Sequence, residues 1–172
     1  THHNALGADL YLRIAPELYL KRLVVGGFEK VYEIGKSFRN EGIDYAHNPE
    51  FTMFELYWAY AQKEQFVSFL EELLATVVRD SLGRLDVPYQ GGTIDFSGPW
   101  KRITFRDAIL ESCSIDIDTL TDREAVIRAS RERGLSIDFT GAIGLGECFD
   151  VLYKKTARAN MTSPVWVLDY PA

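Results

Sequence analysis

Two segments decide the fold of this chain: VYEIGKSFR at residues 31–39 and FTMFELYWAY at residues 51–60. Both are rich in aromatic and branched apolar side chains, which favour β-strands. The eleven residues between them, 40–50, contain several residue types that favour turns, namely Gly42, Asp44, Asn48 and Pro49. The sequence therefore predicts an antiparallel hairpin with a long loop over residues 31–60.

The alternation of side chains along a strand places several polar residues on one face of this hairpin. If Arg39 lies opposite Phe51, then Gly35 lies opposite Glu55 and Glu33 opposite Tyr57. This register predicts a gap over Gly35, beside a carboxylate, a phenol and a guanidinium group. An arginine fork suits a phosphate and a carboxylate suits an ammonium group, so the face is a candidate binding site.

A solvated sheet face with scattered ion pairs is the simpler interpretation of any one of these residues. Glu17 alone fits a carboxylate at the positive end of a helix dipole, and His47 alone fits an ordinary loop histidine. Phe51 alone fits a core residue, and Tyr57 fits one more aromatic side chain in a strand. The combination of the polar face with a long loop that carries His47 favours a binding site.

The remaining sequence predicts helices around this sheet. A helix opens at Pro16 and Glu17 and ends at Gly26, and an amphipathic helix covers residues 64–81. A short strand is predicted at 93–96, and further helices follow at 104–111, 121–133 and 144–159. Thr104 and Thr121 are the expected N-caps, the second with Glu124 in a capping box.

The expected fold class is α+β: an incomplete antiparallel sheet flanked by helices, with a small helical insertion. The expected division is a partial core at 1–101 that contains the hairpin, an insertion at 102–160, and a returning core strand at 161–172. Both ends of the chain read as interrupted, since the first residue is not Met and the last is reached within a strand pattern.

The composition favours a soluble globular domain over several other classes of protein. The chain has 172 residues, 47% hydrophobic content and a net charge of −6, which is ordinary for a soluble globular domain and argues against broad nonspecific nucleic-acid binding. Cys113 and Cys148 are too far apart in sequence for a C-x-x-C pair, so we expect a reducing cytoplasm rather than a disulfide framework. We expect no membrane span and no membrane partner.

Particular motifs resemble one family. FRNEG at 38–42, HNPEFTM at 47–53 and ELY at 55–57 resemble motif 2 of the class II lysyl-tRNA synthetases. LRIAPELYLKRL at 12–23 and the first six residues look like the same family, so the specific resemblance covers residues 1 to about 62. Residues 63–172 match more loosely, mainly by layout and by the closing strand.

The resemblance implies an ATP-dependent enzyme that activates L-lysine as lysyl-adenylate and transfers it to tRNA(Lys). It implies that Arg39 is catalytic and grips the α-phosphate of ATP, and that Phe51 stacks on adenine. The other implied ATP-binding residues are Asn40, Glu41, His47 and Asn48. The implied lysine-binding residues are Glu17, Glu55 and Tyr57.

The resemblance also implies parts that we do not find in this sequence. The loop at 40–50 contains no Arg or Lys to assist Arg39 in neutralising a triphosphate. Motif 1, motif 3 and the acidic ligands for Mg²⁺ are not recognisable, so metal ligands are expected C-terminal to this segment and none within it. We therefore expect a fragment with little or no aminoacylation activity alone, taken from a full-length homodimer.

Three alternatives remain open from the sequence. A paralogue of the lysyl enzyme attaches β-lysine to elongation factor P, and it shares the resemblance from His47 to Tyr57. An aspartyl or asparaginyl enzyme fits less well, because those pockets need a basic residue for the side chain of the substrate. A non-catalytic scaffold or regulatory module is the alternative of a different class.

Overall fold

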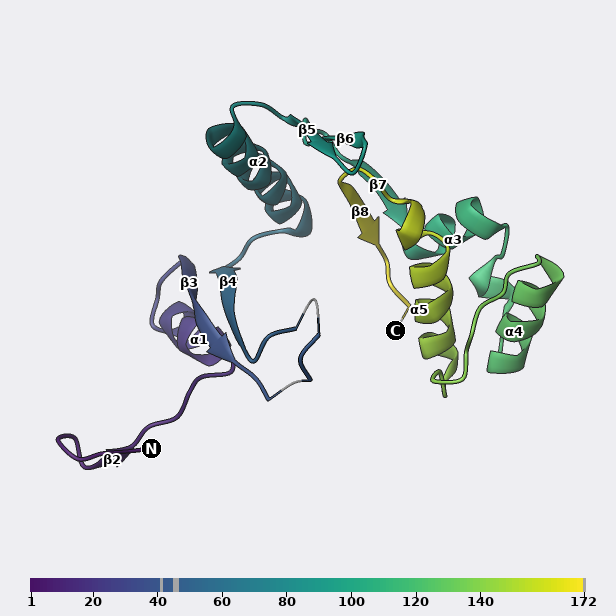
Figure 1. The fold of residues 1–172 in the computed structure, drawn as a ribbon. Helices are drawn as coiled ribbons and strands as arrows, with labels where there is room; N and C mark the ends of the chain where they lie inside the picture. The colour runs from purple at the N-terminus through teal and green to yellow at the C-terminus, as the bar shows by residue number, and fades with distance from the viewer. Residues whose placement is uncertain (41, 45–46, 172) are drawn as a thin grey trace. The chain divides into compact units, whose positions relative to one another are not determined.

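The computed structural model describes residues 1–40, 42–44 and 47–171 (Figure 1). The chain divides into two compact units, Thr1–Phe66 and Val67–Ala172. Among the described residues, no helix is both long enough and apolar enough to cross a membrane.

The first unit is built on the predicted hairpin. Strands β3 (Lys30–Phe38) and β4 (Glu50–Trp58) pair in antiparallel fashion, and helix α1 (Glu17–Val25) packs against both strands. In Figure 1, α1 lies beside β3 and β4. A small hairpin of β1 (His2–His3) and β2 (Ala8–Asp9) precedes this group. The predicted strands and the predicted helix are confirmed to within one or two residues at most of their ends.

Helix α1 begins and ends where its sequence indicates. Pro16 is the N-cap residue, and Glu17 lies in the first turn, where a carboxylate complements the positive end of the helix dipole. The helix ends because Gly27 takes a φ of +101°, a conformation that favours glycine. Leu20 is 3% exposed and anchors the helix to the hairpin.

Exposure alternates along β3 and tells its two faces apart. Odd-numbered residues from Val31 to Ser37 are half-buried or buried, whereas the even-numbered residues from Lys30 to Lys36 are exposed. The same alternation holds along β4 as far as Glu55. The odd-numbered face is therefore the one covered by α1. A contact between the two elements agrees: Lys21 Nζ of α1 is 5.9 Å from the centroid of the Tyr57 ring on β4.

The second unit starts within α2 (Lys63–Leu82) and continues into a short hairpin of β5 (Asp86–Tyr89) and β6 (Gly92–Asp95). Positive φ values of 47° at Gln90 and 82° at Gly91 make the two-residue turn of this hairpin. Strand β6 matches the strand predicted at 93–96. Strand β5 is an addition that the sequence analysis did not predict.

The rest of this unit is a helical region enclosed by a pair of parallel strands. It contains β7 (Lys101–Thr104), α3 (Phe105–Cys113), the 3₁₀ turn η1 (Ile117–Thr119), α4 (Arg123–Glu132), α5 (Leu145–Lys155), η2 (Arg158–Asn160) and β8 (Val165–Leu168). Strand β8 pairs with β7 from Lys101↔Val165 to Thr104↔Leu168. A parallel pair needs a long crossover connection, and α3 to α5 supply it here.

Helix caps agree with one prediction and correct another. The Thr104 hydroxyl accepts a hydrogen bond from Asp107 N at 3.0 Å, so the predicted cap of α3 is confirmed. The prediction that Thr121 caps α4 is wrong. Asp122 is the N-cap, and its carboxylate accepts from Ala125 N at 2.8 Å. An ionised carboxylate complements the helix dipole as well as capping it, which a hydroxyl does not.

Helices α3, α4 and α5 share one hydrophobic core. Ile109, Val126, Cys148 and Leu152 are each 0% exposed, and the core continues through further buried side chains, including Ile103, Phe105, Ile117 and Phe149. The predicted helix at 144–159 is present as α5 followed by η2. The expected division into a core and an inserted region at 102–160 stays a prediction.

Leu152→Ala should lower the free energy of unfolding of the second unit by about 2–5 kcal/mol, because it leaves a cavity in a closed core. Lys155→Ala, on an exposed position of the same helix, should change it by less than about 0.5 kcal/mol. Urea denaturation followed by tryptophan fluorescence in a Trp58→Phe background measures this unit, since Trp100 and Trp166 both lie in it. Equal effects of the two substitutions would contradict this account of the core.

Candidate functional site

The register of the hairpin differs by two residues from the prediction. Gly35 lies opposite Met53, Glu33 opposite Glu55, and Ser37 opposite Phe51. The prediction that Arg39 faces Phe51 is therefore wrong: the Arg39 N–H instead donates to Pro49 O at 2.9 Å. Proline has no N–H of its own, but its carbonyl continues the ladder by one step, and this shortens the loop.

A shift of two residues changes the cross-strand partners and preserves the faces, because side chains alternate with period two. Glu33, Gly35 and Ser37 still share a face with Phe51, Met53, Glu55 and Tyr57, as predicted. The candidate site therefore lies on the odd-numbered face, next to α1.

Arg39 and Phe51 form one part of this site. The Arg39 guanidinium carbon is 5.1 Å from the centroid of the Phe51 ring, and Arg39 Nε lies 3.4 Å from Ile14 O. A cation beside the face of an aromatic ring is a favourable contact. The guanidinium lies over one face of the ring, so a positive group and an aromatic side chain are direct neighbours, as a phosphate joined to an aromatic base would require.

Acidic residues around α1 form the second part. The Glu17 carboxylate accepts a hydrogen bond from Lys21 Nζ at 2.5 Å, across one helical turn. Glu55 Oε2 accepts from the Tyr57 hydroxyl at 3.2 Å. Burial, and then the hydrogen bond to Glu55, raise the pKa of Tyr57 above its ordinary value, which already keeps a phenol protonated at neutral pH. Interaction with Glu17, and then with Tyr57 and Glu55, raises the pKa of Lys21.

These contacts bring Glu17, Glu55 and Tyr57 together, as the sequence analysis expected of a shared pocket. Among the described residues, Glu55 has no cation within salt-bridge distance. Glu55 is thus a half-buried carboxylate that accepts a hydrogen bond from a neutral donor and forms no salt bridge with the described cations, although its charge acts on Lys21. Such a group is ready to receive a cation.

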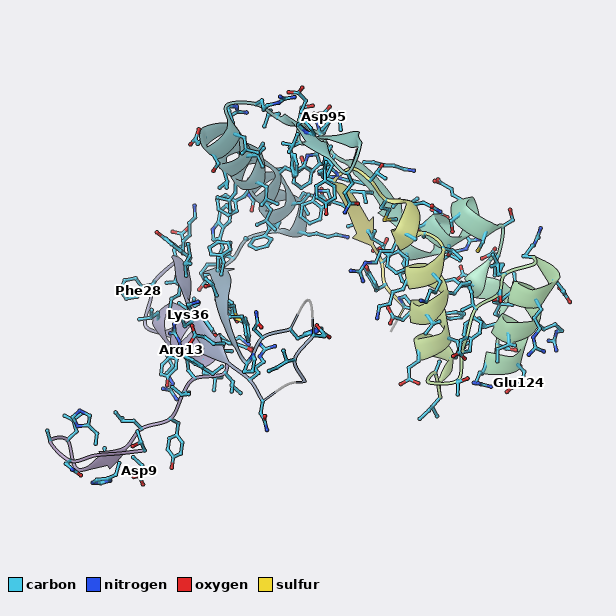
Figure 2. All side chains as sticks on the ribbon, in the orientation of Figure 1. Asp9, Arg13, Phe28, Lys36, Asp95 and Glu124 are labelled. Atoms are coloured by element: carbon cyan, nitrogen blue, oxygen red, sulfur yellow. The ribbon has the colours of Figure 1, made fainter. Side chains whose placement is uncertain are left out.

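The gap predicted over Gly35 is filled by an arginine. Arg13, from the segment before α1, forms an ion pair with Glu33 through Nη1 and donates from Nε to Lys36 O at 2.9 Å. Figure 2 labels Arg13 and Lys36, which come from that segment and from β3. A Cβ atom on residue 35 would collide with the Arg13 guanidinium, so this strand position requires glycine.

The loop residues lie in a more exposed environment. The His47 main-chain N–H donates to Asp44 Oδ1 at 2.8 Å, and His47 Nδ1 lies 2.8 Å from Asp44 Oδ2. Among the described residues, the polar partner of His47 is Asp44, which orients the imidazole. Asn40 and Asn48 are exposed, and Glu41 lies outside the described residues.

Sequence reasoning missed three residues of this site: Arg13, Lys21 and Asp44. Two of them had signals that it did not use. Glu17 and Lys21 have the i,i+4 spacing that pairs charges along a helix, and a glycine inside a strand marks close approach of another group. The residue that approaches Gly35 is 22 positions away in the sequence, so its identity was not accessible from spacing.

Comparisons with known proteins identify a family to which this chain is similar. A family model described as tRNA synthetases class II (D, K and N) matches residues 1–172. The chain is 48% identical to a lysine–tRNA ligase of Moorella thermoacetica over 171 residues, covering 99% of the chain and 35% of that protein. It is 45% identical to the lysine–tRNA ligase of Pelotomaculum thermopropionicum over 171 residues, with coverage of 99% and 34%.

A third relative is the lysine–tRNA ligase of Escherichia coli O157:H7, with 44% identity over 176 residues, covering 100% of the chain and 34% of the relative. The chain therefore spans about a third of the length of the curated relatives that it matches.

Proposed function

This chain belongs to the class II tRNA synthetases of the D, K and N group, and from that premise we propose that it supplies the lysine-activating site of a lysine–tRNA ligase. The observation that carries the proposal is Glu55, a half-buried carboxylate that accepts from the Tyr57 hydroxyl and has no salt bridge among the described residues. A pocket built in this way selects an ammonium group.

The charge balance of the site supports lysine over the other two amino acids of the group. Glu17, Glu33 and Glu55 supply three carboxylates, and Lys21 and Arg13 pair with the first two of them. One negative charge is left for the substrate. The side-chain ammonium of lysine neutralises it, whereas the carboxylate of aspartate would be repelled and the amide of asparagine would leave it unpaired.

The proposed first reaction joins lysine to AMP. The lysine carboxylate attacks the α-phosphorus of ATP, a bond to the bridging oxygen breaks, and pyrophosphate leaves with that electron pair. Because the carboxylate is already ionised, the step needs no general base, and catalysis rests on positioning and charge stabilisation. Arg39 is the residue in this chain that would stabilise the charge on the α-phosphate, and its guanidinium fork suits that task.

Two neighbouring residues support ATP as the proposed nucleotide substrate. Phe51 offers a ring for stacking of adenine, with Arg39 beside it. His47, oriented by Asp44, and the amides of Asn40 and Asn48 are the proposed further contacts in the loop, together with Glu41. Mg²⁺ is proposed to balance the phosphate charges. No group of three acidic, His or Cys side chains among the described residues could hold this ion.

The second proposed reaction transfers the lysyl group to the terminal adenosine hydroxyl of tRNA(Lys), with loss of AMP. We also propose a homodimer for the complete protein, and a cytoplasmic location. The transfer to tRNA and the homodimer are proposed from the resemblance of the motifs to those of the lysyl-tRNA synthetases. The free thiols of Cys113 and Cys148 are compatible with a reducing compartment.

The test is ATP–pyrophosphate exchange by the protein from the complete reading frame that contains this chain, with lysine, β-lysine, aspartate and asparagine compared at equal concentration. We expect lysine to drive exchange at least about tenfold faster than the others, because the site has one unpaired carboxylate. A preference for β-lysine would move the assignment to the enzyme that modifies elongation factor P. The absence of exchange with all four would favour a non-catalytic module.

A further inference from the structure

Arg13 is bound along the free edge of β3, the edge that does not face β4. Its main-chain oxygen accepts a hydrogen bond from Phe38 N at 2.8 Å, and its Nε donates to Lys36 O at 2.9 Å. These two bonds occupy backbone groups that an edge strand would otherwise leave unpaired. Arg13 is thereby fixed at a defined point along the hairpin.

From that edge, the tip of the Arg13 side chain reaches onto the odd-numbered face of the sheet. Its guanidinium covers Gly35 and pairs with Glu33, and both side chains of this pair are 32% exposed. Because Gly35 has no side chain, the pair occupies the space between the strand and the segment before α1. The ion pair can therefore form in this position only because residue 35 has no side chain.

Glu33 lies directly opposite Glu55 in the ladder. Like charges at directly opposite positions repel one another. The structure separates the two carboxylates by turning them in opposite directions along the strands. Glu33 Oε1 lies 3.1 Å from the position of a Cβ on Gly35, on the side of Arg13, whereas Glu55 Oε2 turns to the Tyr57 hydroxyl.

Either member of the Arg13–Glu33 pair, if left alone, could reach the lysine site. Gly35 and Glu55 are diagonal neighbours on the same face, and long side chains span that separation. An Arg13 freed from Glu33 would still cover Gly35, from which Glu55, a carboxylate that forms no salt bridge among the described residues, lies one diagonal step across the ladder. A Glu33 without Arg13 would offer a second carboxylate to a substrate ammonium.

We propose that the Arg13–Glu33 ion pair is a specificity-determining element of the lysine site, in which each member keeps the other away from Glu55. Arg13 and Glu33 are positioning residues, since neither needs to touch the substrate. This inference rests on the proposed lysine-activating function. It adds that Glu33, although it is a carboxylate on the substrate-facing side, serves to hold Arg13 and not to bind lysine.

The test compares Glu33→Gln, Arg13→Met and the double substitution in the protein from the complete reading frame, by ATP–pyrophosphate exchange with lysine and ATP varied in turn. Glu33→Gln should raise the KM for lysine about tenfold, because a freed Arg13 that occupies Glu55 nine-tenths of the time leaves one-tenth available. The KM for ATP should change by less than about twofold, because the effect is confined to the pocket.

The double substitution is the decisive variant. It removes the competing guanidinium, so it should bring the KM for lysine back to within about threefold of the unmodified protein. Arg13→Met alone should lower kcat, because an unpaired Glu33 draws the ammonium away from Glu55, and it should not raise the KM for lysine. Glu33→Asp keeps a carboxylate for Arg13 and should behave like the unmodified protein.

If the Arg13–Glu33 ion pair only stabilised the fold, the KM values of the variants would follow a different pattern. In that case Arg13→Met and Glu33→Gln would raise both KM values alike, and the double substitution would be no better than either single one. That result would overturn the inference. The matched control is Lys36→Met with Glu50→Gln, which removes a cross-strand pair at 3.3 Å on the opposite face and should leave both KM values unchanged.

The proposed function and the proposed role of the ion pair can be disproved separately. The absence of lysine-dependent exchange in the unmodified protein would remove the proposed function and this inference with it. Normal exchange with lysine, together with a Glu33→Gln variant whose KM for lysine is unchanged, would leave the proposed function in place and overturn the role of the ion pair alone.

Discussion

Arg39→Ala should slow lysine-dependent ATP–pyrophosphate exchange by about 100- to 1,000-fold, the usual cost of removing one group that stabilises charge in a transition state. The reason is that the loop at 40–50 contains no Arg or Lys to take over. The loss should fall mainly on kcat, because the charge on the α-phosphate grows as the adenylate forms.

Arg39→Lys keeps the positive charge and loses the planar fork, so it should be intermediate. Arg84→Ala is the matched control, since it removes an exposed arginine that pairs with Asp86 at 2.9 Å, in the second unit. Measurement of kcat and both KM values by exchange decides the matter. An Arg39→Ala protein that retains more than about a tenth of the activity would show that Arg39 is not the group at the α-phosphate.

Glu55→Gln should raise the KM for lysine about 100-fold, because it removes the negative partner of a half-buried ammonium group. The substitution is close to isosteric. The amide oxygen of Gln can still accept the hydrogen bond that the Tyr57 hydroxyl donates to Glu55 at 3.2 Å. The geometry of the pocket should therefore persist while its charge is lost, and the KM for ATP should change by less than about threefold.

Glu50→Gln is the control for this substitution, because Glu50 lies on the same strand and its side chain pairs with Lys36 on the exposed face. Steady-state exchange with lysine and ATP varied separately gives both KM values. A parallel rise of the two KM values in Glu55→Gln would mean that Glu55 supports the sheet as a whole and does not read the ammonium group.

Local patterns were sufficient to predict most of the elements that build the site. Apolar strand formers on both sides of a turn-rich loop predicted β3 and β4, and the Pro16–Gly26 signals predicted α1. The alternation of side chains placed Glu55, Tyr57 and Phe51 on one face, and the structure agrees. The assigned roles of these residues as ligands of lysine and ATP remain proposals.

Contacts between residues far apart in the sequence could not be predicted from local patterns. The register was two residues in error because alternation is unchanged by an even shift, and the Arg39–Pro49 step that sets it depends on the course of the loop. The β7–β8 pair joins residues that are 64 positions apart. No local signal in residues 101–104 indicated that partner, so β7 was missed.

The sequence by itself determined the hairpin, the helix that bears Glu17, and the side of the sheet on which the acidic residues lie. These features follow from periodicity and turn chemistry within a few residues. Only the tertiary structure decided that Arg13 fills the space over Gly35 and pairs with Glu33. That choice depends on which distant side chain reaches a given carboxylate, and among the described residues it leaves Glu55 without a salt bridge.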